Sequence, residues 1–123
     1  MKTYTNAEVN AALKAALELK GEEYVYERGP HNSCDYARNG EPSCIVGHVL
    51  HTLNKGLFEK VAEYENGPTP YEGYTFNDVA IALDLPFTKI QVKALRAAQF
   101  DQDLGESWGQ AAIDYMNVLG ETL

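Results

Sequence analysis

The chain has 123 residues, of which 45% are hydrophobic and 23% are charged, and its formal net charge is −8 at pH 7. This length suits one globular domain, and the composition argues against a disordered or fibrous protein. So acidic a chain is expected to repel nucleic acid and anionic membranes over most of its surface. The sequence contains no apolar run near the roughly 20 residues that cross a bilayer, and its first residues lack the apolar core of a signal peptide. We therefore expect a cytoplasmic protein whose two cysteines are thiols.

The N-terminal third of the chain predicts one helix, an extended segment and a loop. Thr5 begins a capping box, apolar residues recur at helical spacing after it, and Gly21 ends the helix. Residues 22–27 are rich in β-forming side chains and predict an edge strand, for which residues 71–74 are a candidate partner. Residues 28–41 predict a loop, because Gly, Pro and Asn-Gly signals lie at its two ends.

The middle of the chain predicts two further helices. The second helix is expected to run from Pro42 or Ser43 to Leu53, with proline near its first position. A third helix is expected over residues 57–64. Residues 66–74 predict a loop, since two prolines forbid continuation of the helix.

Three more helices are expected in the C-terminal half. Each begins at a hydroxyl residue followed three positions later by an acidic or amide side chain, which is the pattern of a helix N-cap. The fourth runs from Thr75 to Leu83, the fifth from Thr88 to near Asp101, and the last starts at Ser107. The sequence therefore predicts a mainly α fold, a compact bundle of about five or six short helices with at most a small two-stranded β element, in one domain over residues 1–123.

The metal-binding and nucleophilic side chains gather in one short stretch of the chain. All histidines and both cysteines lie there: His31, Cys34, Cys44, His48 and His51. Two donors from a loop and two from one helix face can supply the tetrahedral site that zinc prefers, so His31, Cys34, Cys44 and His48 are candidate ligands. The alternatives are a buried thiol with partly exposed histidines, a disulfide, and a cysteine–histidine dyad that lacks a partner to orient its base.

Residues 79–90 are similar to the helix-turn-helix of bacterial repressors. In that pattern Ala80, Leu85 and Ile90 are the buried positions. A basic stripe on the second helix, at i, i+4 and i+7, would then face phosphates: Lys89, Lys93 and Arg96. The chain departs from the pattern at Asp84, where glycine is usual, at Pro86, where a polar cap is usual, and at Lys93, near a position that should be apolar. The other interpretation is two amphipathic helices joined by a tight turn.

Acidic surface and aromatic residues suggest a protein partner. Residues 59–72 and 101–121 carry much of the negative charge and are expected to face a basic partner, in the manner of a nucleic-acid mimic. Trp108, Tyr71 and Tyr74 are the aromatic residues most suited to anchoring an interface. The alternative for Trp108 is that it fixes the last helix to the core.

Two segments resemble small uncharacterised proteins of actinobacteria and actinobacteriophages. The first reads CDY at residues 34–36 and GEPSCIVGHVL at residues 40–50. The second reads LRAAQ at residues 95–99, followed by Gln102-Asp103, Gly105 and Trp108-Gly109. The resemblance implies a bacteriophage or bacterial accessory protein in the host cytoplasm, and it brings no catalytic residues or cofactor with it.

These observations favour a small bacteriophage-type protein that acts by contact with a host or phage protein rather than by catalysis. We expect no cofactor, no membrane contact and no nucleic acid partner. A zinc-stabilised module and a helix-turn-helix-like DNA-binding protein are the two alternatives.

Overall fold

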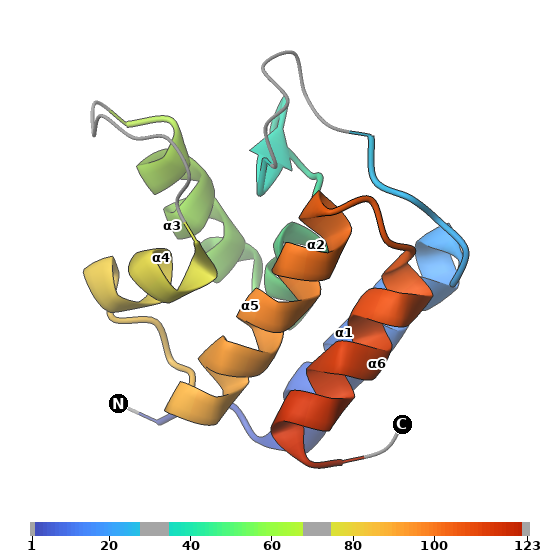
Figure 1. Ribbon diagram of the computed structural model, residues 1–123. Helices are drawn as coiled ribbons and strands as arrows, with labels where there is room; N and C mark the ends of the chain where they lie inside the picture. Colours follow the sequence, from blue (N-terminus) through green and yellow to red (C-terminus); the bar gives the residue numbers. More distant parts are fainter. Residues whose placement is uncertain (1, 28–34, 68–74, 122–123) are drawn as a thin grey trace.

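The fold is mainly α, as the sequence predicts. The computed structural model describes residues 2–27, 35–67 and 75–121, and within them it contains six helices and one two-stranded antiparallel sheet (Figure 1). The elements in chain order are α1 (Asn6–Lys20), β1 (Ala37–Arg38), β2 (Glu41–Pro42), α2 (Ile45–Leu53), α3 (Lys55–Glu65), α4 (Phe76–Ala82), α5 (Lys89–Asp103) and α6 (Trp108–Leu119).

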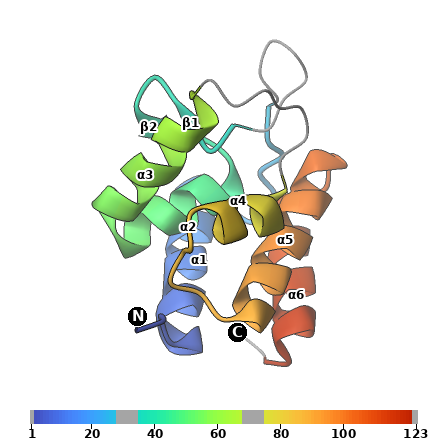
Figure 2. The same cartoon turned by 90° about the vertical axis from the view of Figure 1, so that its left-hand side faces the viewer.

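The helices form two layers around a single core. α5 and α6 are an antiparallel pair in one layer, and α1 and α2 pack against each other in the layer behind them (Figures 1 and 2). α3 continues from α2, and α4 lies beside α5 near the side of α3. The largest fully buried side chains come from all six described helices, which shows that both layers share this core: Trp108, Tyr115, Phe58, Phe76, Leu13, Ile45, Leu50 and Leu95.

Four predicted helix starts are confirmed by their capping hydrogen bonds. The side chains of Thr5, Thr75, Thr88 and Ser107 each accept a bond from the backbone N–H three residues later, at the start of α1, α4, α5 and α6. The second helix begins later than predicted. α2 starts at Ile45 because Cys44 is its N-cap, and the proline expected at the helix start lies in β2 instead.

The small sheet does not lie where the sequence suggested. Ala37 pairs with Pro42 and Arg38 with Glu41, within a region predicted as loop. The reason is the Asn39-Gly40 turn, whose positive φ values of 56° and 79° are those of a tight hairpin. The proposed partner of the 22–27 strand, residues 71–74, lies outside the described residues. Val25 instead forms an isolated bridge with Ser107, immediately before α6.

Buried glutamines on α5 attach it to the other elements. The Gln99 side-chain oxygen accepts from the backbone N–H of Phe76 (2.9 Å), the first residue of α4, and its amide donates to the Tyr36 hydroxyl (2.8 Å). The Gln102 side-chain oxygen accepts from the backbone N–H of Ile45 (2.7 Å), the first residue of α2. A buried backbone N–H without a partner is unfavourable, so α5 completes the starts of two neighbouring helices.

Candidate functional site

Cys44 and His48, two of the four candidate zinc ligands, are core residues. Cys44 is completely buried, and its sulfur accepts a hydrogen bond from the Gly47 backbone N–H (3.4 Å) as the cap of α2. His48 is 7% exposed. The other two, His31 and Cys34, lie outside the described residues. Within the part of the chain that is described, no group of three His, Cys, Asp or Glu side chains is placed to hold a metal ion.

The environment of His48 keeps its imidazole uncharged at neutral pH. Burial lowers the pKa of His48 to about 4, and the positive charge of Lys20 adds to this effect. Its ring packs edge-on against Trp108, with centroids 5.4 Å apart. These contacts are those of a packed side chain. They explain the presence of Cys44 and His48 by packing in the core, which their spacing in the sequence alone did not indicate.

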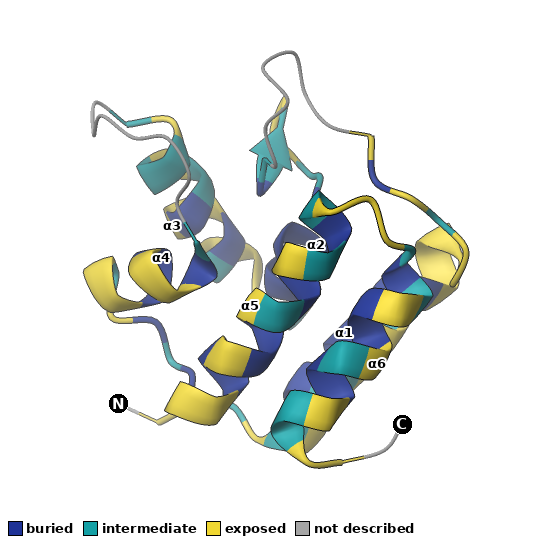
Figure 3. Ribbon diagram, viewed as in Figure 1, coloured by how far each residue is buried: buried dark blue, intermediate teal, exposed yellow. Residues whose placement is uncertain are grey.

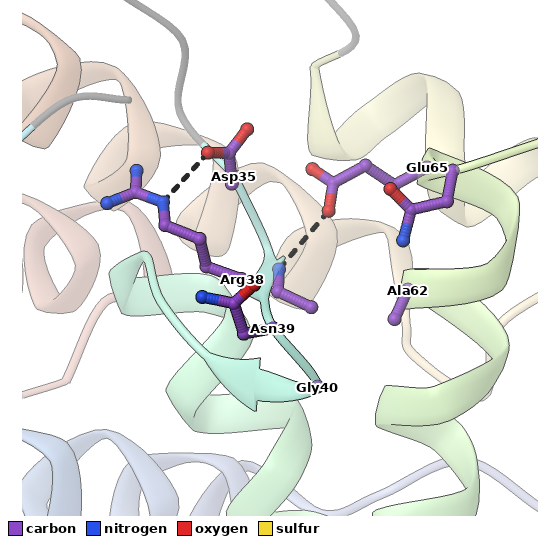
Figure 4. Close-up of a pocket in the computed structure, with 8 residues that line it drawn as sticks. Asp35, Arg38, Asn39, Gly40, Ala62 and Glu65 are labelled. Atoms are coloured by element: carbon purple, nitrogen blue, oxygen red, sulfur yellow. Dashed lines mark hydrogen bonds and ion pairs between the residues drawn. The ribbon is translucent and has the colours of Figure 1, made fainter. Parts of the chain in front are cut away.

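A polar cavity of about 360 Å³ lies between the β1–β2 hairpin and the C-terminal end of α3 (Figure 4). The residues around it come from these two elements: Asp35, Ala37, Arg38, Asn39, Gly40, Ala62, Glu65 and Asn66. Its acidic and basic side chains are already engaged with the protein. Asp35 and Arg38 form an ion pair at 3.0 Å, and the Glu65 carboxylate accepts the backbone N–H groups of Tyr36 (2.9 Å) and Ala37 (3.2 Å).

The charged side chains at this cavity stabilise the position of the hairpin. Burial raises the pKa of Glu65, an effect that the two backbone N–H donors oppose. Arg38 also donates to the Tyr26 hydroxyl (2.6 Å) and lies over the Tyr26 ring. Tyr26 in turn shares a hydrogen bond with Ser43. The polar side chains around the cavity therefore attach the hairpin to α3 and to residues 26–27.

The basic stripe of α5 is exposed, and it continues into apolar residues that the sequence analysis missed. Lys89, Lys93 and Arg96 are all exposed. Exposed positions alternate with buried ones along α5 (Figure 3). One turn further along, Phe100 is 61% exposed and Leu104, directly after the helix, is 64% exposed. The signal was present in the sequence, because Arg96, Phe100 and Leu104 repeat every four residues.

The helix-turn-helix resemblance is matched in part. Ala80 and Leu85 are buried as the pattern requires, and Asp84 adopts φ 49°, in the left-handed region where the pattern has glycine. Ile90 differs, since it is 42% exposed instead of buried. Lys93 is exposed, so its charge does not conflict with the packing.

The aromatic residues proposed as partner anchors are not at a described surface. Trp108 is completely buried and packs against Tyr24 in a T-shaped arrangement, with centroids 4.8 Å apart. Trp108 therefore fixes the last helix to the core, which was the alternative interpretation of the sequence. Its prediction as an interface anchor is wrong. Tyr71 and Tyr74 lie outside the described residues.

Comparisons with protein-family models, curated proteins and solved structures find no match to this chain. Among the described helices, none is both long and apolar enough to cross a membrane. The two segments that resemble actinobacterial and phage proteins do contact each other: Gln99 bonds Tyr36, Gln102 bonds Ile45, and Trp108 packs on His48. The resemblance itself stays a prediction.

Proposed function

We propose that the protein acts by binding another protein through the outer face of α5. This outer face comprises six side chains that share one side of the helix and its end: Lys89, Lys93, Arg96, Phe100, Asp103 and Leu104. The observation that carries the proposal is the exposure of Phe100 and Leu104, one helical turn apart and next to Arg96. Exposed aromatic and aliphatic side chains beside an arginine are typical of the anchors of protein interfaces.

Charge favours a protein partner over nucleic acid. The basic stripe covers only the N-terminal half of α5, and acidic side chains follow it at Asp103 and at the exposed Glu106. Duplex DNA would meet repulsion at this end, because phosphates continue along the whole contact. A protein surface with both acidic and apolar groups fits the outer face better.

We place this activity in the cytoplasm of a bacterial host, as a bacteriophage-type accessory protein that contacts a host or phage protein without catalysis or a cofactor. The resemblance of residues 34–50 and 95–109 to actinobacterial and phage proteins supports this setting. The burial of Cys44 and His48 in the core supports a structural role for the thiol and the imidazole. Zinc analysis of protein purified without chelators tests the alternative of a zinc-stabilised module, which a stoichiometric zinc content would favour.

A photo-crosslinking experiment tests the proposed face. Phe100 is replaced by a photoreactive phenylalanine analogue in the host cell, and Leu19 of α1, which is 70% exposed, receives the same analogue as a matched control. We expect a discrete crosslinked product from position 100 and none from position 19. Equal labelling at the two positions, or no product from position 100, would contradict the proposal.

A further inference from the structure

The partner required by the outer face of α5 must present acidic groups beside apolar ones. The outer face itself has this composition. Its N-terminal part is basic and Phe100 follows Arg96. Leu104 and the half-buried Asp103, which accepts a hydrogen bond from the Gln102 side chain (3.2 Å), lie at its C-terminal end. The order basic, aromatic, then apolar and acidic is self-complementary when a helix is met by a copy of itself running in the opposite direction, because each end then faces the opposite charge.

We infer that the partner of the outer face is a second copy of this chain, paired antiparallel along α5 about a two-fold axis. This inference rests on the proposed function and names its partner. With the axis at the level of Ala98, Arg96 of one copy lies opposite Phe100 of the other, and Lys93 lies opposite Asp103. An arginine over an exposed phenylalanine ring is a favourable cation–π contact. The two-fold axis makes each of these contacts twice.

The positions along the helix agree with this pairing. At 100° per residue the basic stripe, Phe100 and Asp103 fall within about one quarter of the helix circumference, so they can face one partner together. Lys93 and Asp103 are about 15 Å apart along the axis, at a rise of about 1.5 Å per residue, and lie on either side of the aromatic centre. The exposure of Lys93, Arg96 and Phe100 shows that the described residues do not cover this side of α5.

Charge exchange between two variants tests the pairing more sharply than a simple loss of binding. The oligomeric state is measured by sedimentation equilibrium for the wild type, Lys93→Glu, Asp103→Lys and an equimolar mixture of the two variants. We expect the wild type to be a dimer, and each single variant to dissociate at least about tenfold more readily, because it places like charges opposite each other twice. In the mixture one contact is Glu opposite Lys and the other is the native pair, so we expect the dimer to return.

The control is Lys14→Glu, which makes the same charge change at an exposed position on α1 and should leave the dimer unchanged. A monomeric wild type, or a mixture that stays as dissociated as its components, would overturn the inference. That result would leave the proposed function standing if Phe100 still crosslinks to a different protein. A crosslinked product of twice the chain mass at position 100 supports the proposed function and the inferred dimer. The absence of any product from that position counts against the proposed function and the inferred dimer alike.

Discussion

The imidazole of His48 packs edge-on against the indole of Trp108, with an interplanar angle of 68°, and joins α2 to the start of α6. Both side chains are buried, and neither the His48 Nε2 nor the Trp108 Nε1 has a hydrogen-bond partner among the described residues. A charged imidazole is unfavourable in such a place, since Nε2 has no acceptor among the described residues to compensate for its loss of water. This contact makes the stability of the fold dependent on pH.

We predict that acidification destabilises the protein through His48. Its pKa is about 4 in the folded chain against 6.5 for an ordinary histidine, so between these values the unfolded chain binds the proton and the folded chain does not. The free energy of unfolding should therefore fall as the pH decreases through this range, by up to about 3 kcal/mol. Urea unfolding of the wild type and of His48→Gln across the range measures the effect. Equal pH dependence in the two proteins would show that His48 is not responsible.

Asp101 is predicted to act in the opposite direction. Burial, with the neighbouring carboxyl of Asp114, raises the pKa of Asp101 to about 6 from 3.8. The folded state therefore favours the protonated carboxyl, and its contribution to stability grows as the pH falls through this range and is lost as it rises above it. We expect Asp101→Asn to raise the free energy of unfolding near pH 7 by about 1 kcal/mol, a value reduced for the partial exposure of this residue. The gain should shrink below about pH 4, and a gain that does not change with pH would contradict this explanation.

Gln102 is predicted to contribute to stability through α2 rather than through its own helix. Gln102→Leu keeps a side chain of similar size but leaves the backbone N–H of Ile45 buried without its acceptor. We expect this to lower the free energy of unfolding by about 1–3 kcal/mol. Gln110→Leu, at an exposed position on α6, is the matched control and should change it by less than about 0.5 kcal/mol. A similar loss of unfolding free energy in both variants would mean that the hydrogen bond to Ile45 does not account for the effect of Gln102.

Gly47 is predicted to be indispensable for the approach of α2 to the hairpin. A Cβ atom at this position would collide with the backbone carbonyl oxygen of Tyr36. We expect Gly47→Ala to lower the free energy of unfolding by at least about 2 kcal/mol, although alanine is the better helix former. At Gly56 of α3 the nearest atom is the end of the Asn54 side chain, so Gly56→Ala should change stability by less than about 1 kcal/mol. Thermal unfolding of both variants distinguishes the close contact from a general effect of glycine replacement.

Local sequence signals predicted the helices of this fold because their information lies within a few residues. Thr5, Thr75, Thr88 and Ser107 each cap a helix through a neighbour three positions away, and the structure confirms all four. Cys44 was not recognised as the cap of α2, since cysteine is not among the residues preferred there. Asn39-Gly40 is a turn signal of a loop and also of a tight hairpin, and the structure has the hairpin.

The exposure of the candidate site was harder to predict, because it depends on how contacts between residues far apart in the sequence orient α5. The hydrogen bond from Gln99 to Tyr36 and the one from Ile45 to Gln102 join residues 63 and 57 positions apart, respectively, and no local pattern encodes them. The stripe at Lys89, Lys93 and Arg96 was found from its spacing. Its extension to Phe100 was missed, because whether an apolar residue is in the core or on the surface depends on which neighbouring helices cover it.

The side-chain hydrogen bonds that hold α5 to its neighbours affect how its outer face can bind a partner. Because Gln99 and Gln102 hold this helix against two others, Phe100 projects from a backbone that is ordered before any encounter. An incoming molecule would then lose little conformational entropy in ordering the helix, which leaves more of the contact energy for affinity.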